Sequence, residues 1–312
     1  MVLLKIIRRV KKKKKYIFKI VLIIFLILNV LSYLGAYTLT NFVSSGSFGL
    51  GLPRPNSDKN PSDIGLEYIT QRIDINENEW LENWLIPAEN STSKGTIMLF
   101  PGNGGSKAKQ LLASAKVFHN LGYDTLLVDF RGVGDSSGNT TTLGVQEAED
   151  IALTINDSQN LNLQSPLILY GVSMGSAAIL RAIAKENINP DGIILELPFA
   201  RLLDAVKSRL KVMKIPSFPI AQLLVFWGGI QHGFNGFTHN PVNYATQVKC
   251  PTLILHGKLD KWTTVEEIEE IFHNLQVSKE LVIFPNTGHN LLVTVDKEYW
   301  TQSIHNFLKG IL

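Results

Sequence analysis

The pentapeptide Gly171-Val172-Ser173-Met174-Gly175 constrains this chain more than any other feature. It follows a short apolar run, residues 166–170, that predicts a buried strand, and it precedes residues 176–185, whose composition predicts a helix. A Gly-x-Ser-x-Gly between a strand and a helix makes a sharp turn with the serine at its apex. Because a side chain at either glycine would collide with the neighbouring strand or helix, the motif predicts a strained backbone and an exposed hydroxyl at the serine.

The chain after residue 66 alternates apolar runs with helical segments. Two strands, 66–73 and 81–86, are expected to pair antiparallel across a polar turn. Continuous apolar strands that alternate with helices predict a mostly parallel sheet with helices on both faces. The strands expected after these two are 96–100, 125–130, 166–170, 192–197, 252–256 and 281–284, and the expected helices are 106–121, 143–155, 176–185, 265–275 and 290–308.

Residues 198–248 interrupt this alternation. They include an unusually apolar stretch, residues 215–227. Since a structureless loop of this length is uncommon in a compact domain, the segment predicts a small helical lid over the carboxyl ends of the strands. The sequence leaves three alternatives open for these apolar side chains: they line an acyl pocket, they contact a membrane, or they pack on the domain beneath them.

The first 39 residues predict a membrane anchor. Residues 1–19 carry nine Lys and Arg and no Asp or Glu, and residues 20–39 carry no charge at all. Twenty helical residues span about 30 Å, which is the thickness of the hydrocarbon core of a bilayer. The basic residues are expected to hold the N-terminus in the cytoplasm, so that the rest of the chain lies outside it. The alternative is a signal peptide cut after Ala36, which would release a secreted protein.

The composition of the residues after the predicted anchor differs between a linker segment and a folded domain. Residues 40–65 are rich in Ser, Gly, Pro, Asn and Lys and predict a flexible linker, so the folded domain is expected to cover residues 66–312. Without the nine basic residues near the N-terminus, the chain has 21 Lys and Arg against 27 Asp and Glu, a balance of about −6. This acidity argues against a nucleic-acid partner.

The number and spacing of the cysteine and histidine residues argue against internal disulfides and against a metal site. A single cysteine, Cys250, allows no internal disulfide and is expected to be a buried, inert thiol. The seven histidines have no helical or hairpin ligand spacing and no cysteine partners, so no metal site is expected.

A serine nucleophile needs a base, and the base needs a group that orients it. In a parallel sheet the loops after successive strands meet at one edge, so both partners are expected just after strands that follow Ser173. Asp260 lies after the strand 252–256, and His289 lies after the strand 281–284 in a glycine-containing loop. The order Ser173, Asp260, His289 fits this architecture. Glu196, at the end of an earlier strand, is an alternative carboxylate, and His256 is expected to be structural.

An anion that develops at the attacked carbonyl needs oriented donors. One is expected to be the backbone amide of Met174, at the N-terminus of the helix after the nucleophile. The second is expected to be the amide of Asn103, in the glycine-rich loop 101–105 between a strand and a helix. This loop lacks the Gly-x-Gly-x-x-Gly spacing of a dinucleotide site because Lys107 stands at the last glycine position, and no Walker lysine-serine pair follows.

These motifs together resemble the α/β-hydrolases, and most closely the branch of small-lid esterases beside the serine aminopeptidases. The resemblance covers residues 66 to the C-terminus. It rests on segments 101–105, 129–136, 171–175, 255–260 and 288–290. It departs from the usual pattern where the first loop begins Phe-Pro-Gly, at residues 100–102, and many relatives have His-Gly, and at Trp262, where a small or β-branched residue is usual.

The resemblance implies Ser173 as nucleophile, Asp260 as acid, His289 as base, and Asn103 and Met174 as donors to the oxyanion. It implies a serine hydrolase of carboxylic esters or thioesters that needs no cofactor. The lid and the anchor make a lipid-derived acyl substrate attractive. The alternatives are an aminopeptidase-type peptidase and a catalytically silent binding protein of the same fold.

Overall fold

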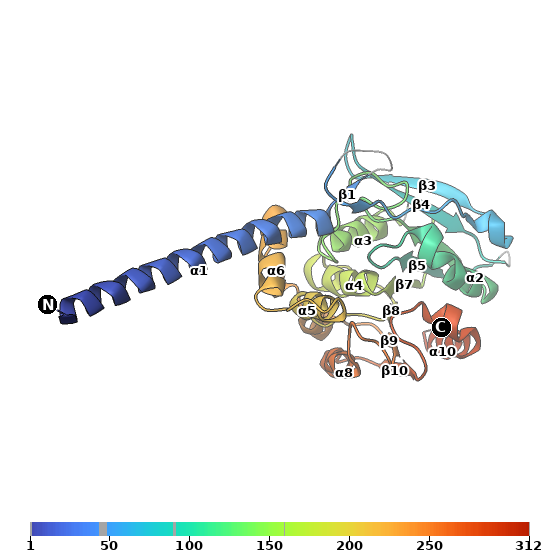
Figure 1. Cartoon of the computed structure of the whole chain (residues 1–312). Helices are drawn as coiled ribbons and strands as arrows, with labels where there is room; N and C mark the ends of the chain where they lie inside the picture. Colours follow the sequence, from blue (N-terminus) through green and yellow to red (C-terminus); the bar gives the residue numbers. More distant parts are fainter. Residues whose placement is uncertain (1, 44–48, 90–91, 159, 312) are drawn as a thin grey trace.

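An eight-stranded sheet forms the centre of the molecule (Figure 1). The computed structural model describes residues 2–43, 49–89, 92–158 and 160–311. The strand order is β10-β9-β8-β7-β5-β6-β4-β3, in which β4 pairs antiparallel with β3 and β6 and the other neighbours are parallel. The strands are β3 (Ile69–Asp74), β4 (Trp80–Ile86), β5 (Thr96–Phe100), β6 (Asp124–Val128), β7 (Leu167–Val172), β8 (Gly192–Glu196), β9 (Thr252–Gly257) and β10 (Lys279–Phe284). The predicted sheet and the antiparallel pairing of its first two strands are confirmed.

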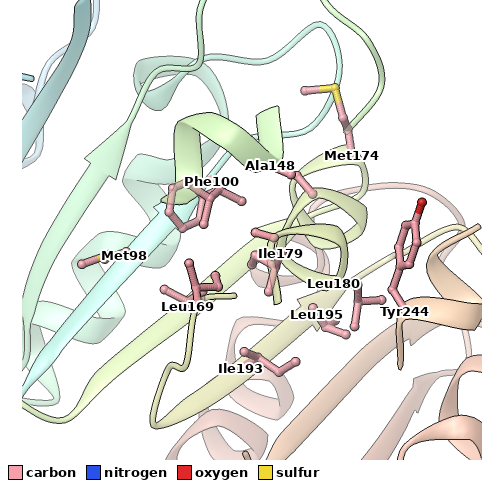
Figure 2. Close-up of a cluster of buried hydrophobic side chains, with 14 of the residues drawn as sticks. Met98, Phe100, Ala148, Leu169, Met174, Ile179, Leu180, Ile193, Leu195 and Tyr244 are labelled. Atoms are coloured by element: carbon pink, nitrogen blue, oxygen red, sulfur yellow. The ribbon is translucent and has the colours of Figure 1, made fainter. Parts of the chain in front are cut away.

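Helices cover both faces of this sheet. One apolar cluster joins the sheet to α3, α4, α7 and α8, and a second joins it to α2, α9 and α10. Figure 2 shows the first cluster, where Phe100 and Leu169 of the strands lie against Ile179 of α4. Burying one such side chain contributes about 1.5–3 kcal/mol. These helices are α2 (Leu112–Asn120), α3 (Gln146–Asn156), α4 (Met174–Lys185), α7 (Pro241–Tyr244), α8 (Val265–Asn274), α9 (Leu292–Val295) and α10 (Lys297–Lys309).

Two expected helices differ in detail from the prediction. The segment 290–308 forms two helices, because Asp296 caps α10 by accepting a hydrogen bond from the backbone amide of Tyr299 at 3.0 Å. The segment 106–121 begins with a π-helical turn, Lys107–Leu111, before α2. A π-turn of this kind often marks a functional site, and this one follows the loop that contains Asn103.

The N-terminal helix α1 (Val2–Thr40) is longer than the predicted span of residues 20–39. Its segment Lys11–Thr40 is long and apolar enough to cross a membrane. Figure 1 shows the helix projecting from the domain, with only its C-terminal part against the rest of the chain. The basic residues continue the helix because Lys and Arg have high helix propensity and no proline interrupts them.

The composition of residues 40–65 predicts a flexible linker, but the described part of this segment is tied to the domain. The short strand β1 (Phe42–Val43) pairs with β2 (Leu52–Pro53). The guanidinium of Arg54 donates hydrogen bonds to the backbone carbonyls of Gly134, Ser136 and Gly138. Residues 44–48 lie outside the described part. The end of α1 is therefore held against the globular domain by hydrogen bonds.

The segment 198–248 is helical, as predicted, but it does not form a simple cover over the sheet. It contains α5 (Leu202–Val212) and α6 (Ile220–Gln231), followed by a 3₁₀ turn (Gly236–Thr238), α7 and a second 3₁₀ turn (Ala245–Gln247). α5 lies near the carboxyl ends of the strands, whereas α6 packs against α1 and α5 (Figure 1).

Candidate active site

Ser173 lies at the apex of a tight turn between β7 and α4. Its backbone φ of +51° is in a region that non-glycine residues rarely adopt, and such strain clusters at functional sites. A Cβ on Gly171 would lie 2.5 Å from the backbone of α4, and one on Gly175 would lie 2.5 Å from the carbonyl oxygen of Phe100. Only glycine fits at both positions. The turn is also fixed by the amide of Ser173, which donates to the carbonyl of Glu196 at 2.7 Å.

His289 lies between Ser173 and Asp260. Its Nε2 is 3.0 Å from the Oγ of Ser173, and its Nδ1 is 2.6 Å from the Oδ2 of Asp260. With Nδ1 as the donor to the carboxylate, Nε2 is the acceptor for the serine hydroxyl. The structure thus brings together three predicted residues that lie far apart in the sequence, in the geometry that a nucleophile, a base and an orienting acid require.

The carboxylate of Asp260 is held in its charged form. Burial alone would raise the pKa of Asp260, but the hydrogen bond and charge of His289 and the amide of Trp262 lower it below the ordinary aspartate value. The Oδ1 atom accepts hydrogen bonds from the amides of Trp262 and Thr263, at 2.7 and 3.2 Å. These two amides orient the carboxylate, so that its other oxygen remains directed at the imidazole.

The two predicted oxyanion donors lie beside Ser173. Met174 is the first residue of α4, so its amide is one of those at a helix N-terminus that have no intrahelical acceptor. Asn103 lies in a turn closed by the amide of Gly105 on the carbonyl of Gly102, at 3.0 Å. The side chain of Gln110 accepts a hydrogen bond from the amide of Gly102 at 2.7 Å and fixes this turn. Gln110 was not predicted from the sequence, because its only signal is its place one turn into the helix after the loop.

A cavity of about 230 Å³ opens at the serine. Its lining includes Asn103, Ser173 and His289, together with Arg209 of α5 and Trp262. The ring of Trp262 lies 4.6 Å from that of His289, and the Arg209 guanidinium lies 4.9 Å from the Trp262 ring. No residue of α6 lines this cavity among the described residues. The most apolar part of the lid therefore does not form the wall of the cavity at the serine.

Arg209 brings a positive charge to this cavity and was not predicted from the sequence. The structure gives it no carboxylate partner within salt-bridge distance among the described residues. Burial lowers the pKa of Arg209, and the negative charge of Asp260 opposes this effect. The cavity therefore combines the hydroxyl of Ser173 with a cation whose charge is only partly compensated.

Glu196 is not the carboxylate that contacts His289. It is fully buried, and its oxygens accept hydrogen bonds at 2.8 Å from the phenol of Tyr170, the indole of Trp300 and the amide of Leu292. Burial raises the pKa of Glu196, while these donors favour its charged form. Leu292 begins the helix three residues after His289, so Glu196 anchors the loop that carries the imidazole.

The remaining candidates have structural surroundings. His256 is buried at the end of β9, with Nε2 3.2 Å from the carbonyl oxygen of Thr263, and burial lowers its pKa. Cys250 is buried, and burial raises its pKa to about 12. In the described ranges, no three His, Cys, Asp or Glu side chains gather as a metal site would require.

Two family models match the chain. The model of the serine aminopeptidase family S33 matches residues 91–241, and that of the PhoPQ-activated pathogenicity-related proteins matches residues 237–312. Among solved structures, an esterase of Pyrococcus furiosus superposes with a TM-score of 0.70 at 24% identity, over 83% of this chain and 96% of the esterase. That similarity shows the fold and confirms the predicted architecture.

The similar curated proteins include a membrane protein and a lipase. The membrane protein YNL320W of Saccharomyces cerevisiae is 24% identical over 255 residues, which is 81% of this chain and 84% of the yeast protein. The lysophosphatidylserine lipase ABHD12 of Xenopus tropicalis is 26% identical over 192 residues. These residues are 58% of this chain but only 46% of the lipase.

Proposed function

Because the chain belongs to the α/β-hydrolase superfamily and is a hydrolase, we propose that it cleaves carboxylic esters or thioesters at Ser173 through an acyl-enzyme intermediate. The observation that carries this proposal is the continuous hydrogen-bonded chain from the Ser173 hydroxyl through His289 to Asp260. In this arrangement the imidazole can remove the proton of the serine hydroxyl while the serine oxygen attacks a carbonyl carbon.

The first half of the reaction forms the acyl-enzyme. The Oγ of Ser173 bonds to the carbonyl carbon as its proton moves to Nε2 of His289, and Asp260 stabilises the imidazolium. The carbonyl oxygen becomes an anion, which the amides of Asn103 and Met174 stabilise. A single donor of this kind lowers the barrier by about 3–4 kcal/mol. The imidazolium then protonates the departing alcohol or thiol.

The second half hydrolyses that intermediate. A water molecule gives its proton to His289 and attacks the acyl carbon, the same two amides stabilise the second anion, and Ser173 leaves with its proton restored. Acid, alcohol or thiol and free enzyme are the products, and every proton is transferred by the imidazole.

We expect the substrate to be a lipid-derived acyl compound. The α1 anchor keeps the domain beside a membrane, where such substrates are concentrated. ABHD12, which acts on lysophosphatidylserine, is among the similar proteins. Arg209 adds a reason from the cavity itself, because a cation with no carboxylate partner there favours a substrate that carries a phosphate or carboxylate near the scissile bond.

The orientation of the anchor is part of this proposal. The lysines at residues 11–15 favour a cytoplasmic N-terminus by the positive-inside rule, so the hydrolase domain is proposed to face the opposite side of the membrane. Protease protection of sealed vesicles that contain the full chain tests this orientation. Digestion of the domain from the cytoplasmic side would contradict it.

Labelling with a fluorophosphonate probe, combined with hydrolysis of p-nitrophenyl acyl esters, tests the reaction. The wild type is expected to react with the probe and to hydrolyse the esters, whereas Ser173→Ala does neither. His289→Ala is expected to fail in the same way, and His305→Ala, a matched control at a histidine of α10 far from the cavity, is expected to keep activity. A catalytically silent binding protein would leave wild type and Ser173→Ala alike. An aminopeptidase would prefer aminoacyl amides over acyl esters.

A further inference from the structure

We infer that α6 is immersed in the membrane that α1 crosses, where it lies across α1 with its apolar face in the lipid. This inference concerns a lipid-binding surface of the lid, and it depends on the α1 anchor and not on the reaction at Ser173. The ligand is the acyl-chain region of one bilayer leaflet.

The first observation is where α6 contacts α1. The indole Nε1 of Trp227 donates to the side-chain oxygen of Asn29 at 3.3 Å, and Gln231 donates to the carbonyl of Tyr33 at 2.9 Å. The rings of Tyr33 and Trp227 pack edge to face, 5.4 Å apart. A Cβ on Gly35 would lie 3.3 Å from Leu224. The contacts therefore begin at Asn29, inside the uncharged span of residues 20–39 and not beyond it.

The second observation is the length of α1 that remains free of the domain. Its described side chains at residues 11–27 are all exposed, and the five consecutive lysines end at residue 15. Residues 16–27 are 12 helical residues and cover about 18 Å, whereas a hydrocarbon core needs about 30 Å. The remaining thickness of the hydrocarbon core, about 12 Å, needs about eight more helical residues, so the membrane span extends to Gly35. If the span begins after Lys19, it ends still closer to the domain.

Both placements of the span put Asn29, Tyr33 and Gly35 within the hydrocarbon core. The helix that packs on them must then occupy the same depth. Tilting α1 lengthens the required span and immerses α6 further. Figure 1 shows α6 running across α1, so an α1 that crosses the bilayer leaves α6 extended within the leaflet.

The third observation is the chemistry of α6. Its 12 residues include no charged side chain. Phe226 and Ile230, one helical turn apart on the side away from α1, are 44% and 59% exposed. A surface hollow of about 560 Å³ lies beside them and is also lined by Phe234 and Phe237. Large exposed apolar side chains around a hollow are costly in water and suit the acyl chains of a lipid.

The polar groups at this interface are also arranged for lipid. Asn29 is the polar residue deepest in the span, and its amide donates to the carbonyl of Phe25 while its oxygen accepts from Trp227. A polar side chain in a membrane helix is stabilised by such partners. The last turn of α5 and the loop before α6 carry the exposed residues Lys211, Met213, Lys214 and Phe218. This combination is typical of a segment at the level of lipid headgroups.

Immersion of α6 connects the membrane to the catalytic cavity. α6 packs on α5, and Arg209 of α5 lines the cavity at Ser173. An apolar cavity of about 70 Å³, lined by residues of α1, α5 and α6 that include Leu39, Leu202 and Leu224, lies between the helices. A lipid that diffuses in the leaflet therefore reaches α5 along protein surface, without first crossing water.

Depth-dependent fluorescence quenching in the full chain tests this inference. An environment-sensitive NBD label is attached at Ile230→Cys, in a Cys250→Ser background and in phosphatidylcholine–phosphatidylglycerol vesicles. Ile69→Cys in β3 is the matched control, because Ile69 is also isoleucine and 55% exposed. Acyl-chain-brominated lipids are expected to quench the Ile230 label at least about twofold, with a blue-shifted emission, and to leave the Ile69 label unchanged, since an immersed apolar face lies about 5–10 Å deep.

The outcomes decide between lipid, water and protein. Equal, water-like emission at the two positions would overturn the inference. A blue shift at residue 230 without quenching by brominated lipid, and with dependence on protein density, would instead indicate contact with a second copy and would also overturn it. Phe226→Cys supplies a second position on the same face in case the first variant folds poorly, which circular dichroism of each labelled protein checks.

Discussion

The cavity at Ser173 and the α1–α6 pair are stabilised by different kinds of contact. At the cavity, buried polar groups are oriented by several hydrogen bonds each, as in the carboxylates of Asp260 and Glu196. Between α1 and α6 the contacts are mostly apolar, and a few isolated hydrogen bonds such as Trp227 to Asn29 complete them. The difference shows that the proposed reaction depends on side chains oriented by hydrogen bonds in a rigid domain. The proposed membrane attachment depends instead on the apolar surface area of the helices and on how deeply they lie in the bilayer.

The largest effect is expected from a substitution that impairs the cavity at Ser173 and leaves the contacts between α1 and α6 intact. Asp260→Asn keeps the shape of the side chain but presents an amide to the imidazole, which favours the wrong tautomer, and kcat is expected to fall about 10⁴-fold. Membrane association, measured by vesicle flotation, is expected to be unchanged. A loss of less than about tenfold would mean that another group orients His289.

The same substitution makes a prediction about pH. The pKa of Asp260 is lowered in the folded state, so the unfolded state binds more protons as pH falls, and the carboxylate stabilises the fold only above its unfolded pKa. We expect the stability difference between wild type and Asp260→Asn to shrink as pH falls below about 4. Urea unfolding at a series of pH values measures it, and a difference that grows with acidity would contradict the assignment.

A smaller effect is expected at Arg209, which lies in the cavity but on the helix that reaches α6. Arg209→Met is expected to lower kcat/KM for acyl esters with a nearby phosphate or carboxylate about 10- to 100-fold, because a charge-assisted hydrogen bond contributes about 1.5–3 kcal/mol. Neutral esters of the same acyl length are the control and are expected to change little. Equal losses for both substrate types would assign Arg209 a structural role, through its contact with Trp262.

Glu196 is expected to matter for stability more than for chemistry. The carboxylate of Glu196 accepts from three buried donors, on Tyr170, Leu292 and Trp300. In Glu196→Gln the amide NH₂ faces one of these donors, and a buried donor without an acceptor lowers the free energy of unfolding by about 1–3 kcal/mol. Because burial raises the pKa of Glu196, the unfolded state binds fewer protons and wild-type stability decreases as pH rises above the ordinary glutamate value. The cost of the substitution should therefore be larger at pH 5 than at pH 8 in urea unfolding. A cost that does not depend on pH would show that Glu196 does not titrate in this range.

The smallest effect is expected between the helices. Trp227→Phe removes the hydrogen bond to Asn29 and keeps the apolar packing, and such bonds within membranes contribute about 0.6 kcal/mol on average. A small decrease in the thermal transition is expected in vesicles, with catalysis unaffected. A loss of catalysis equal to that of Asp260→Asn would show that the two regions are not independent.

The sequence predicted the sheet and the loops at its edge because both depend on local patterns. The apolar runs of β7 and β9 and the glycines around Ser173 are readable from a few neighbouring residues. The catalytic roles of Ser173, Asp260 and His289 stay predictions, although the structure brings their side chains within hydrogen-bond distance. Arg209 and Gln110 had no comparable signal, because each reaches the site from a helix with no motif of its own.

By itself the sequence determined that an uncharged helix of about 30 Å precedes an α/β domain, because length, charge and periodicity are properties of consecutive residues. Only the tertiary structure decided which carboxylate contacts His289 and which helix packs against α1. Glu196 ends β8 and Asp260 follows β9 of the same sheet, and only the distances show that Asp260 contacts His289 whereas Glu196 accepts from the amide of Leu292. The place of α6 likewise depends on contacts between residues nearly 200 positions apart, which no local pattern records.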